Sequence, residues 1–120
     1  MKESNIRNKR FAFAVRVVKL YQYLAEKKEF VLSKQLLRSG TSVGAMVREA
    51  EHAESKADFV HKMAIAQKEI NETIYWLELL AATKYLSKQE FESINNDAVE
   101  LLKILTTIIK NAKQNLTTNN

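Results

Sequence analysis

Apolar residues recur at alternating steps of three and four along most of the chain, which is the spacing of one face of an α-helix. The pattern appears in four segments, residues 8–26, 31–54, 56–83 and 88–113. Each segment is long enough to form a helix that buries one face against its neighbours. Because only short stretches separate the segments, consecutive helices must run antiparallel. The pattern therefore predicts an all-α fold, an antiparallel up-down-up-down four-helix bundle.

One stripe in each segment supplies the expected core. The stripe positions are Phe13, Val17, Leu20 and Leu24; then Leu32, Leu36, Ser39, Val43, Met46, Ala50 and Ala53; then Phe59, Met63, Ala66, Ile70, Thr73, Leu77 and Leu80; and finally Phe91, Ile94, Ala98, Leu101, Leu105, Ile108 and Ala112. Ser55 and Ser87 can cap the third and fourth helices. Asp58 and Glu90, three residues further on, can each complete a capping box.

Composition narrows the class of protein. A chain of 120 residues with 46% hydrophobic content suits a single domain over residues 1–120, with an ordered core over about 8–113. The polar tail, 115–120, is expected to fray. The chain has no proline, two glycines and no cysteine, which favours long helices and excludes disulfides and thiolate zinc sites. No apolar run approaches the roughly 18 residues that span a membrane, so we expect a cytoplasmic protein without membrane contact.

Further apolar residues lie beside the stripes and make them wider than one small core requires. They are Phe11, Ala14, Val18 and Tyr21 in the first helix, Ile65, Trp76 and Leu79 in the third, and Val99, Leu102 and Ile109 in the fourth. One interpretation is a wide core with some exposed aromatic side chains. The interpretation that we favour is self-association, in which these flanks are covered by other copies of the chain.

Gly40 and Gly44 stand inside the second helix, where each glycine costs about 1 kcal/mol relative to alanine. Being four residues apart, they share one face, and that face would let another helix approach closely. A kink or break between the two glycines is the alternative. A phosphate-binding loop is excluded, because neither the preceding strand nor the lysine of the GxxxxGK motif is present.

Two Glu-x-x-His-like spacings suggest metal chemistry at first sight. Glu49 with His52, and Asp58 with His61, would each place two ligands on one helical face. Both histidines, however, turn away from the apolar stripes of their helices. The first and fourth helices also offer only apolar residues at core positions, so further carboxylate ligands are missing. We therefore predict no metal site and no cofactor.

Glu69 and Glu72 form a second carboxylate pair, on one face of the third helix beside Trp76. General acid and base catalysis could use such a pair. No histidine, serine or lysine is linked to it by spacing, so a salt bridge with Arg38 at a helix seam is the better interpretation. The sequence predicts a protein that is not an enzyme.

Basic residues gather where the first helix begins and the fourth ends, in a chain of net charge +5. The candidate nucleic-acid-binding residues are Arg7, Lys9, Arg10, Arg16 and Lys19 on the first helix, and Lys103, Lys110 and Lys113 on the fourth. Such a positive flank could bind a phosphate backbone. It could instead face Glu49, Glu51 and Glu54 of a neighbouring copy in a head-to-tail ring, or simply be solvated.

Four stretches carry a resemblance to a known family. They are residues 35–45 (QLLRSGTSVGA), 48–50 (REA), 56–59 (KADF) and 66–77 (AQKEINETIYWL). Together they resemble the four-helix-bundle family named for proteins encoded in intervening sequences of large-subunit ribosomal RNA genes. This family includes the accessory variability protein of diversity-generating retroelements. The resemblance extends from Phe11 to Lys113 and departs at Met46, where such proteins often carry asparagine.

The resemblance implies a homo-oligomeric ring, with a pentamer favoured, and no enzymatic activity. For the retroelement branch it also implies binding of RNA or DNA and of a reverse transcriptase through a basic surface. The expected helix-seam and oligomer positions are Arg38, Ser42, Gly44, Glu49, Glu69, Glu72 and Trp76, to which the helical spacing adds Gly40. We therefore predict a non-enzymatic, homo-oligomeric accessory protein that binds structured RNA. The alternative is a protein-interaction scaffold without nucleic-acid contact.

Overall fold

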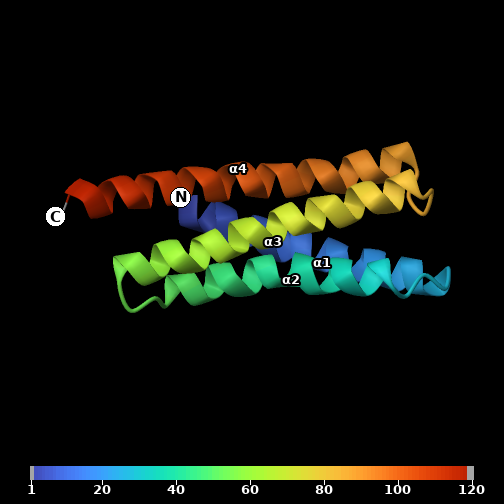
Figure 1. Cartoon of the computed structure of the whole chain (residues 1–120), viewed down its shortest axis with the longest axis horizontal. Coiled ribbons are helices and arrows are strands. Elements are labelled where there is room, and N and C mark those ends of the chain that lie inside the picture. The colour runs from blue at the N-terminus through green and yellow to red at the C-terminus, as the bar shows by residue number, and fades with distance from the viewer. Residues whose placement is uncertain (1, 119–120) are drawn as a thin grey trace.

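Four α-helices form the fold in the computed structural model, which describes the backbone of residues 2–118 and the side chains of residues 6–115. The helices are α1 (Lys2–Glu26), α2 (Leu32–Glu51), α3 (Lys56–Ala82) and α4 (Lys88–Thr118). Figure 1 shows that the chain reverses direction at each connection, in a bundle measuring 53 × 22 × 22 Å. The predicted all-α, antiparallel four-helix bundle is confirmed.

The helix bounds differ from the prediction mainly at the two ends of the chain. Ile6 is buried, and because it lies two turns before Phe13 it extends the core stripe of α1 toward the N-terminus. α4 continues to Thr118, beyond the end of the predicted ordered core at residue 113. No glycine or proline interrupts that part of the helix.

Both predicted serine caps are present, and the capping box of α4 is complete. The amide of Asp58 donates a hydrogen bond to Ser55 Oγ at 3.0 Å, and the amide of Glu90 donates to Ser87 Oγ at 3.1 Å. The Glu90 carboxylate in turn accepts from the amide of Ser87 at 2.8 Å. At α3 the Asp58 carboxylate instead accepts from the amide of Glu54 at 3.2 Å, so only the α4 box closes on its own serine.

The start of α2 is held by a residue that the sequence analysis missed. The buried carboxylate of Glu29 accepts hydrogen bonds from the amides of Val31, Leu32 and Ser33 at 3.2, 3.0 and 2.6 Å. Burial opposes ionisation of Glu29, but these amide donors outweigh it and hold the pKa of the carboxyl below its ordinary value. Glu29 therefore acts as a charged cap for α2.

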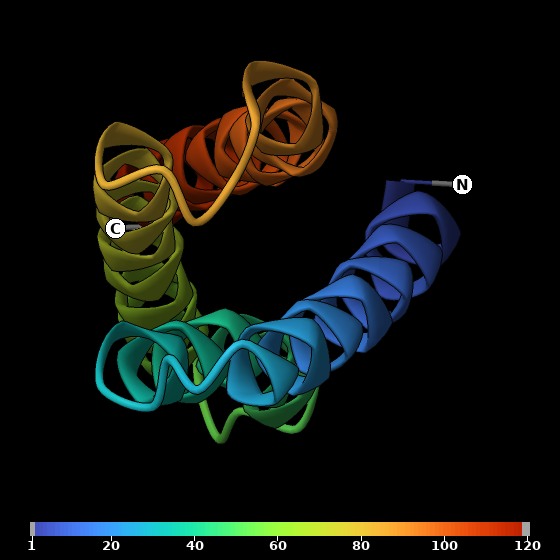
Figure 2. The same cartoon turned by 90° about the vertical axis from the view of Figure 1, so that its right-hand side faces the viewer.

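The core follows the predicted stripes closely. The fully buried side chains include Phe13, Val17, Leu24, Leu36, Ile70, Leu77, Leu80, Leu101 and Leu105. Toward the end of α4 the structure differs from the predicted stripe, because Ile109 is buried and Ile108 is only half-buried. In α2 the buried face also includes Gly40 and Val47, because α2 lies between α1 and α3 and must bury a surface against each (Figure 2).

Candidate functional site

Arg7 and Arg10, two of the predicted nucleic-acid-binding residues, face α2. Arg7 Nε lies 3.5 Å from Glu51 Oε2, and Arg10 Nη2 lies 3.2 Å from Glu51 Oε1. One carboxylate thus offsets two guanidinium groups. Glu51, which the head-to-tail alternative pairs with cations of a neighbouring copy, thus pairs with Arg7 and Arg10 of the same chain.

Lys9 and Arg16 face the other neighbour, α4. Lys9 Nζ lies 2.9 Å from Glu100 Oε2, and Arg16 Nη1 lies 2.6 Å from Asp97 Oδ2. Arg16 also donates to the backbone and side-chain oxygens of Ser93, at 3.1 and 2.9 Å. The four cations therefore do not form one free positive flank.

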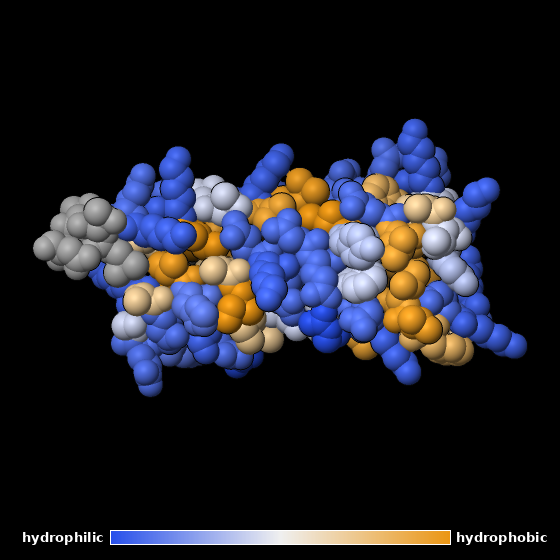
Figure 3. Space-filling model, in the orientation of Figure 1, coloured by the Kyte–Doolittle hydropathy of each residue, from blue (hydrophilic) through white to orange (hydrophobic). Residues whose placement is uncertain are grey.

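The remaining predicted cations project from the bundle. Lys19, Lys103 and Lys110 are exposed, and no carboxylate lies within ion-pair distance of them in the part of the chain that the structure describes. Lys113 is exposed as well. Lys103 and Lys110 are two turns apart on the same side of α4. Hydrophilic side chains project along the edge that α4 forms in Figure 3. Of the predicted nucleic-acid-binding residues, Lys103 and Lys110 thus form an exposed pair on the outer face of α4.

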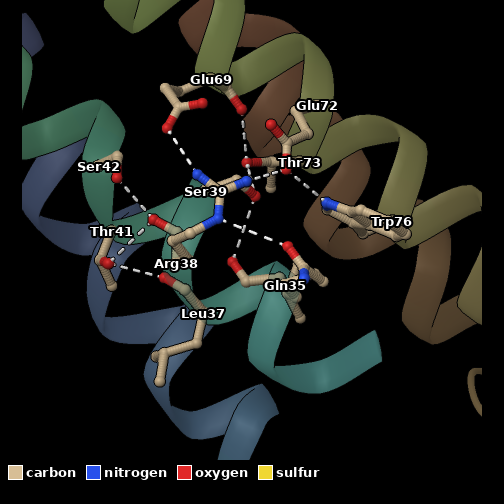
Figure 4. A network of polar contacts seen from close by, with 11 residues as sticks. Gln35, Leu37, Arg38, Ser39, Thr41, Ser42, Glu69, Glu72, Thr73 and Trp76 are labelled. Carbon is tan, nitrogen blue, oxygen red and sulfur yellow. Dashed lines mark hydrogen bonds and ion pairs between the residues drawn. The ribbon is translucent and has the colours of Figure 1, made fainter. Parts of the chain in front are cut away.

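Arg38 joins α2 to α3, as the sequence analysis predicted (Figure 4). Its Nη1 lies 3.1 Å from Glu69 Oε2, and its Nη2 is paired with Glu72. Trp76 Nε1 donates a hydrogen bond to Glu72 Oε2 at 2.9 Å. The Trp76 donor and the nearby Arg38 charge hold the pKa of Glu72 below its ordinary value, against an opposing effect of desolvation. The two carboxylates serve a helix seam in this structure.

Beneath the Arg38 pair lies a buried polar contact that the sequence analysis missed. Thr73 Oγ1 is 2.9 Å from Ser39 Oγ and 2.8 Å from the backbone oxygen of Glu69 (Figure 4). Ser39 and Thr73 are both fully buried. They occupy core-stripe positions of consecutive helices, and two hydroxyl residues in such positions were the signal for a hydrogen bond across the seam.

The other predicted seam residues divide between the neighbours of α2. Glu49 pairs with Lys62 of α3 at 3.1 Å. Gly40 faces α1 so closely that an added Cβ would lie 2.8 Å from both methyl groups of Val17, whereas one at Gly44 would lie 3.8 Å from the backbone oxygen of Arg10. Ser42 Oγ donates within α2, to the backbone oxygen of Arg38. The glycine face therefore receives α1 of the same chain, and α2 passes through both glycines as one continuous helix.

The possible metal ligands do not converge. His52 and His61 are both exposed. Among the residues that the structure describes, no group of three or more histidine, aspartate or glutamate side chains could hold a metal ion. No helix in the described part of the chain is both long enough and apolar enough to cross a membrane.

Comparisons with known proteins place this architecture. A solved structure from Bacteroides thetaiotaomicron VPI-5482, a protein with unknown function from the S23 ribosomal protein family, has a TM-score of 0.90 and 58% sequence identity. The match covers 92% of this chain and 99% of that one. No curated protein matches the chain. The relation to retroelement accessory proteins stays a prediction. The family model of the 23S rRNA-intervening sequence proteins matches residues 2–107, and the chain belongs to this family.

Proposed function

We propose that the protein is a non-enzymatic accessory protein that assembles into a homo-oligomer and binds structured RNA through the outer face of α4. The observation that carries the RNA-binding part is the presence of exposed lysines, Lys103 and Lys110, two turns apart and without a carboxylate partner in the described chain. Unpaired surface cations gain most from contact with phosphate, because no intramolecular ion pair has to be given up.

A second apolar face on α1 supports assembly. Phe11 is 72% exposed, and Val15 and Val18 are 37% and 38% exposed. Their spacing places them on one side of α1, away from the buried stripe that includes Phe13 and Val17. Apolar side chains aligned along a helix form a patch of the kind that subunit interfaces cover. A head-to-tail ring, with five copies favoured by the family resemblance, would cover this strip in every subunit.

The RNA-binding part is tested by removing charge from α4. Replacing both Lys103 and Lys110 by glutamine should weaken binding of a structured RNA hairpin and reduce the slope of log K against log salt by about one per lysine. Fluorescence anisotropy across a salt series measures both quantities. The matched control replaces the exposed residues Lys34 and Lys56, at the starts of α2 and α3, and should leave the slope unchanged. Absence of salt-dependent RNA binding would refute the proposal.

A protein-interaction scaffold is the second candidate function. It is favoured by the pairing of Arg7, Arg10, Lys9 and Arg16 with carboxylates of the same chain, which leaves fewer cations for RNA. A partner that co-purifies with the protein and resists nuclease treatment would support it. A reverse transcriptase is the partner that the resemblance to the retroelement branch implies.

A further inference from the structure

A cavity of about 890 Å³ opens at the end of the bundle where α1 begins and α4 ends, lined by residues of all four helices. Its volume lies within the range of small-molecule sites, which is roughly 300–1,000 Å³. Figure 2 shows α1 and α4 as the widely separated pair on the open side of the bundle.

The wall of the cavity that lies against the core is apolar. Ile6, Val47 and Met63 are buried at its base, and Phe59 and Ile108 are half-buried beside them. The five side chains come from four different helices, so together they form a concave apolar surface. Such a surface suits the apolar body of a ligand.

The rim of the cavity is cationic. Arg7, Arg10 and Arg48 line it, whereas Glu51 is the sole carboxylate among the described lining residues. The exposed imidazole of His52 stands beside them. Three guanidinium groups against one carboxylate leave an excess of positive charge, which favours an anionic head group.

Arg10 adds a specific need for an acceptor. Its side chain is 11% exposed, and its Nη2 is paired with Glu51. Its Nη1 is buried and has no hydrogen-bond partner in the described part of the chain. A buried donor without an acceptor is unfavourable, and a ligand oxygen reached by a small rotation of the guanidinium would satisfy it.

We propose that this cavity binds a small organic anion, a carboxylate or phosphate monoester carried on an apolar group. The head group pairs with Arg10 and Arg48, and the apolar group covers Met63, Phe59 and Ile108. This site is separate from the proposed RNA-binding face, because Lys103 and Lys110 do not line the cavity. Either a fatty acid or a soluble phosphate ester presents this chemistry.

Titration of the full chain with octyl phosphate and octanoate, followed by amide chemical shifts, tests the proposal. Saturable shifts should appear around His52, Met63 and Asn111. Octanol and octyltrimethylammonium, which keep the tail and lose the negative charge, should bind roughly ten- to a hundredfold more weakly. Octanoate binding tighter than octyl phosphate would indicate a fatty acid, and the reverse order a phosphate ester. Equal affinity for octanol and the two anions, or no saturable shift, overturns the proposal.

Three variants connect the binding to the cavity. Arg48→Met removes a rim charge from an exposed position and should weaken octyl phosphate severalfold while the fold stays intact. Ile108→Trp keeps every charge and fills the cavity, so it should also weaken binding. Lys19→Met removes an exposed α1 cation that lies outside the cavity and makes no ion pair in the described chain, so it is the control and should change nothing. If neither Arg48→Met nor Ile108→Trp changes the affinity, the site lies elsewhere and the proposal fails.

The RNA variant separates the two proposals. Replacing Lys103 and Lys110 by glutamine should leave octyl phosphate binding unchanged, whatever it does to RNA. Loss of octyl phosphate binding in that variant would place the anion on the outer face of α4 and overturn the cavity site.

Discussion

The seam between α2 and α3 and the seam between α1 and α4 are built differently. Between α2 and α3, the Arg38 ion pairs and the Glu49–Lys62 pair lie over a buried hydroxyl contact and closely packed apolar side chains. Between α1 and α4, packing is sparse, and in the described residues the ion pairs of Lys9 and Arg16 lie over no buried hydroxyl contact. The α2–α3 seam is thus closely packed, whereas the α1–α4 seam is loosely packed and is called the open seam below.

Hollows flank the ion pairs of the open seam. The cavity of about 890 Å³ lies toward the start of α1, and a second hollow of about 480 Å³ lies toward the other end, where Leu20, Tyr23 and Ile94 line it. Exposed ion pairs contribute only about 0–1 kcal/mol each, so they hold the two helices together weakly. α1 therefore depends mainly on α2 for its position, and its α4 side is the less closely packed part of the bundle.

The largest expected effect tests the dependence of α1 on α2. Gly40→Val should lower the free energy of unfolding by about 3 kcal/mol, because an added Cβ already lies 2.8 Å from both Val17 methyl groups and the valine methyls would collide further. Gly44→Val is the matched control and should cost less than about 1 kcal/mol, since its Cβ makes ordinary contacts. Urea unfolding measures both. Equal losses would show that α1 is not seated on Gly40.

The next effect tests the buried hydroxyl contact between α2 and α3. Thr73→Val keeps the shape of the side chain but removes its hydrogen bond to Ser39, and should cost about 2 kcal/mol because the Ser39 hydroxyl stays buried. The double variant with Ser39→Ala should recover part of the loss. Thr106→Val, which removes an exposed contact with Gln67, is the control and should cost less than about 0.5 kcal/mol. If Thr73→Val also cost less than about 0.5 kcal/mol, the buried contact would contribute little to stability.

A smaller effect concerns the start of α2. Glu29→Gln should cost about 1.5 kcal/mol at neutral pH, because the charged cap of three amides is lost. The pKa of Glu29 is lower in the folded chain than its ordinary value of 4.5, so its stabilising contribution is full above that pH. The contribution is lost as the pH falls through the folded pKa. The stability difference between the wild type and the variant should therefore shrink below about pH 4.5.

The exposed Glu26→Gln is the control for this experiment. It should change the stability by less than about 0.5 kcal/mol at any pH. A difference between the wild type and Glu29→Gln that stayed constant down to pH 2 would contradict the role of the ionised carboxylate.

Residues that act within one helix, or between consecutive helices of known direction, could be predicted from the sequence. The apolar stripes, the Ser55 and Ser87 caps and the pairing of Arg38 with Glu69 belong to this group. The distribution of the α1 cations could not be predicted. The stripe of α1 indicates which face is buried, but the partner of Arg10 or Arg16 depends on the register and crossing angle of α1 against each neighbour.

Glu29 and the Ser39–Thr73 contact were within reach of the sequence but were missed. Glu29 lies outside the periodic segments, although an acidic residue just before a helix is itself a capping signal. Ser39 and Thr73 were predicted as core residues of their stripes. A buried hydroxyl group needs a hydrogen-bond partner, and each hydroxyl is the nearest such partner for the other across the seam. The cavity and its unpaired Arg10 nitrogen depend on how far α1 and α4 separate, which no single helical pattern records.

The smallest effect compares one arginine from each seam. Arg38→Met should cost about 1 kcal/mol, because Glu69 and Glu72 are left close together and partly buried without their cation. Arg16→Met should cost about 0.5 kcal/mol, because Asp97 is 45% exposed and water replaces the arginine readily. Both values come from urea unfolding of the full chain.

Native-state hydrogen exchange shows which helices lose amide protection in each variant. Arg16→Met should speed the exchange of amides in α1 and α4 through local opening, and leave α2 and α3 protected. Arg38→Met should instead act on α2 and α3, whose protection follows global unfolding. If Arg16→Met costs more than Arg38→Met, or loosens all four helices alike, the α1–α4 seam is as much a part of the cooperative core as the α2–α3 seam. The open side of the bundle would then be a static feature of the fold rather than a place where α1 yields to a ligand.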